Sequence, residues 1–188
     1  MNFIGLIGFS LASVAYGIFA LLIVAARNKS LLARWVLLCT LVTFSSNLVT
    51  ALQIKLGYSL QWAMLADGIK IACWSLLIIL FNTEDRSIRV LIKSYYVRQY
   101  IGIWVLLTVG CWLASYWLGY AYQYIFLLFI ILNLWVLVLL EQLYRNANLH
   151  VRWAIWPLVI ALASASIFDF VLYAQATMVD GIDFDFWY

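Results

Sequence analysis

Six long apolar runs decide what this chain can fold into. They cover residues 3–25, 31–53, 60–81, 101–119, 122–144 and 153–178. Each run is close to the roughly 20 residues that a helix needs to cross a hydrocarbon core about 30 Å thick. Barrel strands would instead alternate in face over about ten residues, and a helix satisfies its own backbone hydrogen bonds in lipid. The sequence therefore predicts an all-α, polytopic membrane helix bundle of about six transmembrane helices in a single membrane domain, 1–188.

The overall composition excludes a water-soluble fold. Hydrophobic residues make up 68% of the chain and charged residues 10%, against roughly 45–50% and about 25% in an ordinary soluble domain. The formal net charge of +3 is explained by basic residues that lie on one side of the membrane, and so requires no anionic ligand. We expect the lipid bilayer to be the main partner of the chain, and we expect no nucleic-acid binding.

The basic residues gather around alternate connections between the apolar runs. Nine of the 11 flank the first, third and fifth connections: Arg27, Lys29, Arg34, Arg86, Arg89, Lys93, Arg98, Arg145 and Arg152. The second connection holds only Lys55, and Lys70 lies within a run. Lys and Arg are retained on the cytoplasmic side. The pattern predicts that the N-terminus faces away from the cytoplasm and, with six crossings, that residue 188 does too.

The third connection is long enough to hold structure of its own. Residues 82–100 place Ile88, Leu91 and Ile92 at helical spacing against basic residues. This pattern indicates either an amphipathic helix on the cytoplasmic membrane surface or an extension of the next span. A separate feature is the single proline, Pro157, which is expected to kink the last span near its inner end.

Ionisable side chains inside the spans are the candidate functional residues. Asp67 and Lys70 are three residues apart, hence on one helix face, and Asp169 stands in the sixth run. Asn47 lies at a similar depth to the two aspartates, which predicts one polar layer of Asn47, Asp67, Lys70 and Asp169. Such residues are costly in lipid and usually pair. The layer is either a ligand or proton site open to the outside, or hydrogen-bonded contacts that hold helices together.

Other chemistry-bearing residues favour structural roles. Glu141 and Arg145 are one turn apart at the inner end of the fifth run and suit an interfacial ion pair. Cys39, Cys73 and Cys111 each lie in an apolar run without metal-ligand spacing. No catalytic triad, phosphate-binding loop or zinc motif is present in the sequence. We therefore expect no enzyme activity, cofactor or metal in this chain.

Four stretches of the chain carry a recognisable pattern: ADGIKIACWSLL at 66–77, EQLYRNAN at 141–148, RWAIWPL at 152–158 and FDFVLYAQA at 168–176. Together they resemble the membrane region of the PrsK-type sensor histidine kinases of PEP-CTERM/exosortase systems. The similarity is specific from about residue 141 to 187 and looser before that. Two positions depart from the family pattern, since Trp156 replaces a lysine and Phe168 a tyrosine.

The resemblance implies a fold and a function for the parent protein. It implies a bacterial inner (cytoplasmic) membrane protein that senses a signal at the envelope, forms a homodimer and passes the signal to a cognate response regulator. Exopolysaccharide and PEP-CTERM protein expression are the implied outputs. Because a kinase needs cytoplasmic ATP and residue 188 is predicted outside, the resemblance also implies a seventh span and a cytoplasmic kinase region after 188.

Two other classes of function remain open on the sequence. A small transporter or channel subunit could use the Asp67, Lys70 and Asp169 layer as its path. A structural membrane subunit could need a partner protein to bury that layer. A further span followed by a kinase region downstream would favour the sensor, whereas a stop codon after Tyr188 would favour the other two classes.

Overall fold

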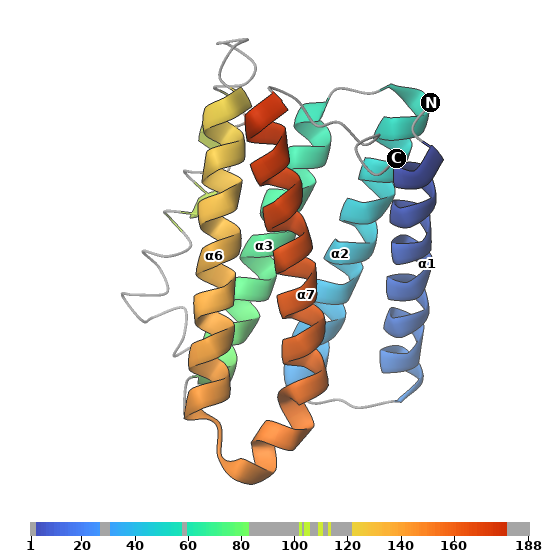
Figure 1. Ribbon diagram of the computed structural model, residues 1–188. Coiled ribbons are helices and arrows are strands. Elements are labelled where there is room, and N and C mark those ends of the chain that lie inside the picture. The colour runs from blue at the N-terminus through green and yellow to red at the C-terminus, as the bar shows by residue number, and fades with distance from the viewer. Residues whose placement is uncertain are drawn as a thin grey trace. The chain divides into compact units, whose positions relative to one another are not determined.

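A computed structural model describes residues 3–26, 31–57, 60–82, 102, 104, 105, 109, 110, 113 and 122–179. All regular structure within these residues is helical (Figure 1). The helices are α1 (Phe3–Ala25), α2 (Leu31–Leu56), α3 (Leu60–Asn82), α6 (Tyr122–Asn146) and α7 (Leu149–Val179). Among the residues described, these five helices are long and apolar enough to cross a membrane. The all-helical prediction is therefore confirmed, and the chain is a multi-pass membrane protein.

The helix bounds follow the apolar runs closely. α1 begins and ends where the first run does, whereas α2 and α3 extend to Leu56 and Asn82, slightly beyond their runs. Of the predicted span 101–119, the described residues are helical, and the rest lies outside the described part. The predicted amphipathic connection 82–100 also lies outside it, apart from Asn82. The count of six spans and the single-domain prediction stay predictions.

The chain divides into two compact units. Of the described residues, those up to Cys73 form the first unit and those from Trp74 to Val179 form the second. α3 contributes residues 60–73 to the first unit and 74–82 to the second.

In the first unit, small side chains let α1 approach α2. Ser13 and Ala20 are buried on α1, and a Cβ atom at Gly17 would lie 3.3 Å from a ring carbon of Phe44 on α2. The Ser13 hydroxyl donates to the Phe44 carbonyl at 3.5 Å. Small residues three or four apart are typical of helix contacts in lipid, where close packing replaces the hydrophobic driving force. The opposite face of α1 exposes leucine and valine side chains, as lipid contact requires.

Gly17→Leu should separate α1 from α2. A leucine adds three carbons beyond a Cβ that is already 3.3 Å from Phe44, so overpacking should cost about 1–3 kcal/mol of unfolding free energy. Gly8→Leu is the matched control, because nothing lies within 4 Å of a Cβ at Gly8. Thermal unfolding of the two variants in the same detergent makes the comparison. Equal melting temperatures would contradict this account of α1 packing.

Three threonine side chains of α2 are held in an apolar span by hydrogen bonds to their own helix. Thr40, Thr43 and Thr50 of α2 donate to the carbonyls four residues earlier at 2.7, 2.8 and 3.1 Å. This back-bonding is the standard way for a helix to hold a hydroxyl without water. α2 ends at Leu56, and the next residue, Gly57, has a φ of 68° in the left-handed region and donates its N–H to the Gln53 carbonyl at 2.9 Å.

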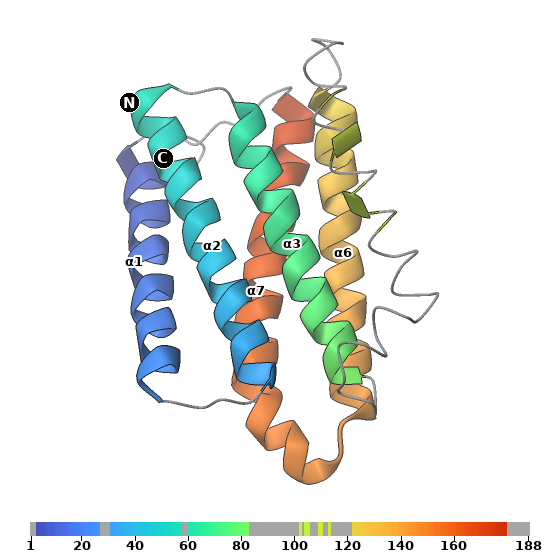
Figure 2. The ribbon, with the colours of Figure 1, turned by 180° about the vertical axis from the view of Figure 1, so that it is seen from behind.

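In the second unit, α6 and α7 form a packed helix pair (Figures 1 and 2). Three aromatic rings join them. The Tyr173 ring of α7 stacks on Phe129 of α6 with 4.8 Å between centroids, and Phe126 lies 6.2 Å from the same ring. Tyr173 and Phe126 are almost completely buried. α7 continues through Pro157, which cannot donate a backbone hydrogen bond.

Candidate functional site

Asp67 and Lys70 form an ion pair inside a membrane span. The Lys70 Nζ atom lies 3.0 Å from Asp67 Oδ1, and the two side chains are 13% and 16% exposed. Both belong to α3, one turn apart, so the pair needs no other helix for its geometry. Opposite charges at this distance reduce the cost of placing either side chain in lipid.

Ser46 joins this ion pair to the neighbouring helix. Its hydroxyl on α2 donates to Asp67 Oδ1 at 2.6 Å, so one carboxylate oxygen accepts from both Lys70 and Ser46. Hydrogen bonds to ionised acceptors are short and strong. We call Ser46, Asp67 and Lys70 the α2–α3 junction. Ser46 was not among the residues predicted for the polar layer, whereas Asn47 was, although the run Ser45-Ser46-Asn47 within a span indicates a polar position.

The other two predicted layer residues are found in different places. Asn47 is buried on α2, next in sequence to Ser46. Asp169 is half-buried on α7 and belongs to the second unit. The structure thus brings Asp67 and Lys70 together and places Asn47 next in sequence to the serine that donates to Asp67. The inclusion of Asp169 in one layer with them stays a prediction.

A second contact between α2 and α3 involves a pair of cysteines. The Cys39 thiol, which is completely buried, donates to the Cys73 carbonyl at 3.3 Å. Both thiols are free. Within the described residues, no group of three or more histidine, cysteine or acidic side chains is placed to hold a metal ion. Cys111 lies outside the described part.

Two depressions follow the line between α2 and the first half of α3. One has a volume of about 390 Å³ and is lined by residues that include Arg34, Leu38 and Ser46. The other has a volume of about 470 Å³ and is lined by residues that include Gln53 and Trp62. Val49, Ala66 and Ile69 line both. The two depressions are therefore neighbours along one groove that passes Ser46.

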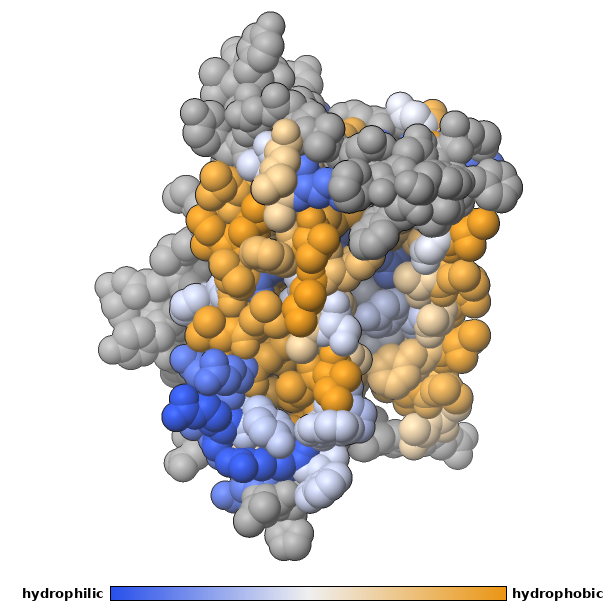
Figure 3. Space-filling model, in the orientation of Figure 1, coloured by the Kyte–Doolittle hydropathy of each residue, from blue (hydrophilic) through white to orange (hydrophobic). Residues whose placement is uncertain are grey.

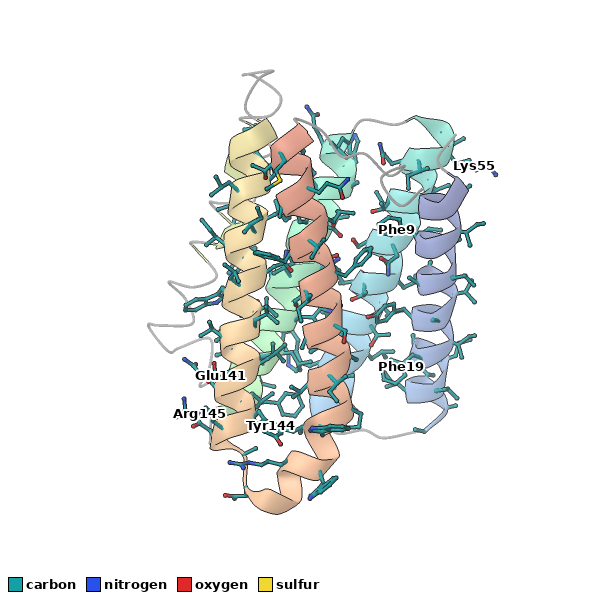
Figure 4. The ribbon with its side chains drawn as sticks, in the orientation of Figure 1. Phe9, Phe19, Lys55, Glu141, Tyr144 and Arg145 are labelled. Atoms are coloured by element: carbon teal, nitrogen blue, oxygen red, sulfur yellow. The ribbon has the colours of Figure 1, made fainter. Side chains whose placement is uncertain are left out.

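Glu141 and Arg145 lie at the end of α6, with Tyr144 beside them (Figure 4). Arg145 Nη1 is 3.5 Å from Glu141 Oε1, and the side chains are 75% and 65% exposed. Exposed ion pairs contribute about 0–1 kcal/mol because solvent screens them. The space-filling view shows hydrophilic residues gathered at this end of α6 and α7, below an apolar band (Figure 3). The pair is suited to a membrane interface.

Arg152 holds the turn between α6 and α7, a role that was not predicted from the sequence. Its Nε donates to the Ala147 carbonyl and its Nη2 to the Arg145 carbonyl, both at 2.9 Å. Its guanidinium also lies over the Tyr144 ring, 5.4 Å from the centroid. The last carbonyls of a helix lack partners within the helix. A cation at this end also interacts favourably with the negative end of the helix dipole. From the sequence, Arg152 was assigned only to the cytoplasmic side of the membrane and to the stretch 152–158 that resembles the kinase family.

Arg152→Ala should lower the unfolding free energy by about 1.5–3 kcal/mol, because two charge-assisted hydrogen bonds and the ring contact are lost. Arg152→Lys should recover less than half of this loss, since an ammonium cannot bond both carbonyls as a planar fork does. Equilibrium unfolding in mixed micelles measures both variants. If the lysine variant is as stable as the original chain, charge alone explains the effect and the fork geometry is irrelevant.

No protein-family model, curated protein or solved structure matches this chain. The site must therefore be interpreted from its own chemistry. The α2–α3 junction combines a carboxylate, an ammonium and a hydroxyl within hydrogen-bonding distance. This set can hold two helices in one arrangement, or exchange a hydrogen bond with a ligand that reaches Asp67.

Proposed function

We propose that this chain is the membrane-embedded sensor region of a bacterial two-component histidine kinase. It has no catalysis of its own and lies in the inner membrane. The α2–α3 junction is the observation that carries the proposal, because it is an intramembrane ion pair with a discrete bond to a second helix. Its Asp67 and Lys70 fall within residues 66–77, one of the stretches that resemble PrsK-type kinases.

Charge placement at the helix ends supports six spans with the N-terminus outside. α2 begins near Arg34 and ends near Lys55, and α6 ends near Arg145. If the arginine-rich ends are cytoplasmic, α3 ends inside and α6 begins outside. The chain between Asn82 and Tyr122 then has to cross the membrane an odd number of times. The apolar run 101–119 is the natural candidate for that crossing.

Signal transfer in this proposal requires two arrangements of the helices. A ligand changes their populations only if it binds one arrangement more tightly than the other. The Ser46–Asp67 hydrogen bond joins α2 to α3 and can be present in one arrangement and broken in the other. Small helix shifts amplified by such discrete contacts are an established type of switching transition. The shift would pass through a seventh span to a dimeric kinase and its response regulator, which controls exopolysaccharide and PEP-CTERM protein expression.

The test combines the gene sequence with single substitutions. The sensor proposal expects a further span and a kinase region to follow the codon for Tyr188. In that full protein, Asp67→Asn and Asp169→Asn should each change reporter output while the protein is present at its normal level. Unchanged output together with a lower melting temperature would assign these aspartates to helix packing and contradict the switching role.

A transporter or channel subunit is the second candidate, and the buried polar face of α2 favours it. Thr40, Thr43, Ser46, Asn47 and Thr50 are all buried and recur at helical spacing. A continuous polar face leading to Asp67 is a feature of ion and proton paths. Ion flux through liposomes that contain only these 188 residues would favour this candidate over the sensor. A structural subunit that requires a partner protein predicts neither flux nor kinase output.

A further inference from the structure

The contact between α6 and α7 is a regular seam of residues spaced alternately three and four apart. The buried members of the seam are Phe126, Phe129, Asn133, Val136, Leu140 and Leu143 on α6, and Leu162, Ser166, Tyr173 and Ala176 on α7. Asp169, which is half-buried, stands at the α7 position between Ser166 and Tyr173. Residues at this spacing lie on one face of a helix and interdigitate with the same pattern on a partner helix. The stacking of Phe129 on Tyr173 at 4.8 Å shows which positions lie opposite each other.

One layer of this seam receives a polar residue from each helix. A short turn joins α6 to α7, so the two helices run in opposite directions. Asn133 follows Phe129 by one turn along α6, and Asp169 precedes Tyr173 by one turn along α7. Because Phe129 lies opposite Tyr173, Asn133 and Asp169 fall in the same layer. Asn133 is the one buried polar residue among the described residues of α6, and Asp169 is the one acidic residue of α7.

The Asn133 amide is chemically suited to a carboxyl group in this layer. Its side chain is 1% exposed, and Nδ2 donates to the Phe129 carbonyl at 2.9 Å. A carboxamide carries two N–H donors and an acceptor oxygen, so this bond uses only part of its capacity. An acidic side chain within a span is costly and usually finds a partner. An amide can donate to a carboxylate or accept from a carboxylic acid, so it suits Asp169 in either protonation state.

We propose that Asn133 is a positioning residue for Asp169, which it holds in the α6–α7 seam through a polar contact across one layer. This contact belongs to the second unit and is separate from the α2–α3 junction. It gives the α6–α7 pair a polar interaction in addition to the aromatic cluster one turn away. A part for the contact in signalling rests on the proposed function, which uses Asp169, whereas the contact itself does not.

The experiment exchanges the two groups and measures chemical unfolding of the full chain in mixed micelles. Asn133→Asp places two carboxyl groups in one layer. Adding Asp169→Asn to it restores one amide and one carboxyl group with their positions exchanged. The unfolding equilibrium constant of this double variant should be about three- to twentyfold smaller than that of Asn133→Asp, as one interhelical hydrogen bond allows. A double variant no more stable than Asn133→Asp would overturn the proposal.

Ser166→Ala is the matched control, because Ser166 is a buried polar residue in the neighbouring layer of the same seam. Combined with Asn133→Asp, it should give no recovery, and a recovery equal to that from Asp169→Asn would count against the proposal. Should Asn133→Asp fail to fold, Asn133→Ala and Asp169→Ala form a double-mutant cycle. The double alanine variant should then be about three- to twentyfold more stable than the product of the single effects predicts, and multiplicative effects would refute the contact.

Kinase output in the full protein separates the contact from its part in signalling. The exchanged pair should recover output that Asp169→Asn alone loses. Recovered stability without recovered output would contradict only the signalling role of the contact. A failure of the stability test would leave the sensor proposal standing, because the α2–α3 junction carries that proposal.

Discussion

Lys70→Met should lower the unfolding free energy by about 3–5 kcal/mol. The substitution removes the cation that lies 3.0 Å from the Asp67 carboxylate, where both side chains are at most 16% exposed. Breaking a buried ion pair leaves one charge uncompensated, and this penalty exceeds the net value of the intact pair. Equilibrium unfolding in mixed micelles measures the loss.

The double variant Asp67→Asn with Lys70→Met distinguishes charge from packing. It removes both charges while keeping side chains of similar length, and should recover most of the stability lost in Lys70→Met. Glu141→Gln provides the matched control, because it breaks a pair of the same chemistry whose side chains are 75% and 65% exposed. Its effect should stay within about 1 kcal/mol. A double variant as unstable as Lys70→Met would show that the ion pair is not what the substitution disrupts.

Tyr173→Ala should be the second most damaging substitution, with a loss of about 3 kcal/mol. It removes a ring that stacks on Phe129 at 4.8 Å and contacts Phe126, in a site that is 2% exposed. The expected loss is at the low end for aromatic residues in soluble cores. Lipid is as apolar as the core, so only the packing contribution is lost.

Phe168→Ala is the control for Tyr173→Ala. Phe168 is another aromatic residue of α7, but half of its surface is exposed, so its removal should change stability by less than about 1 kcal/mol. Tyr173→Phe keeps both ring contacts and should retain most of the stability. If Phe168→Ala and Tyr173→Ala melt at the same temperature, the aromatic cluster is not what holds α6 to α7.

Hydropathy located the described helices well because a span in lipid is defined by its length and apolar character. It located their ends less well, since ends depend on local chemistry. α2 continues to Leu56 because Gly57 supplies the left-handed residue that ends it. α7 begins at Leu149, earlier than its apolar run, and the Arg152 N–H already donates to the Asn148 carbonyl. Asn148 thus occupies the N-cap position of α7, where asparagine is a favoured residue.

The candidate site could be predicted from the sequence only where its residues belong to one helix. Asp67 and Lys70 are neighbours on one helix, so their spacing alone placed them together. Ser46 and Asn47 are adjacent and similarly polar, and only the packing of α2 against α3 decides that Ser46 contacts the carboxylate. The same holds for Arg152, whose partners are backbone carbonyls that carry no signal in the sequence.

Cysteine labelling at Lys55 and Arg145 tests the six-span proposal most directly. Both side chains are exposed, at the end of α2 and of α6. In a variant with Cys39, Cys73 and Cys111 replaced by alanine, Lys55→Cys or Arg145→Cys is treated with a membrane-impermeant maleimide. Three crossings between the two positions predict labelling of Lys55→Cys in intact spheroplasts, and of Arg145→Cys only after permeabilisation. Labelling of both from the same side would mean an even number of crossings, and would contradict six spans.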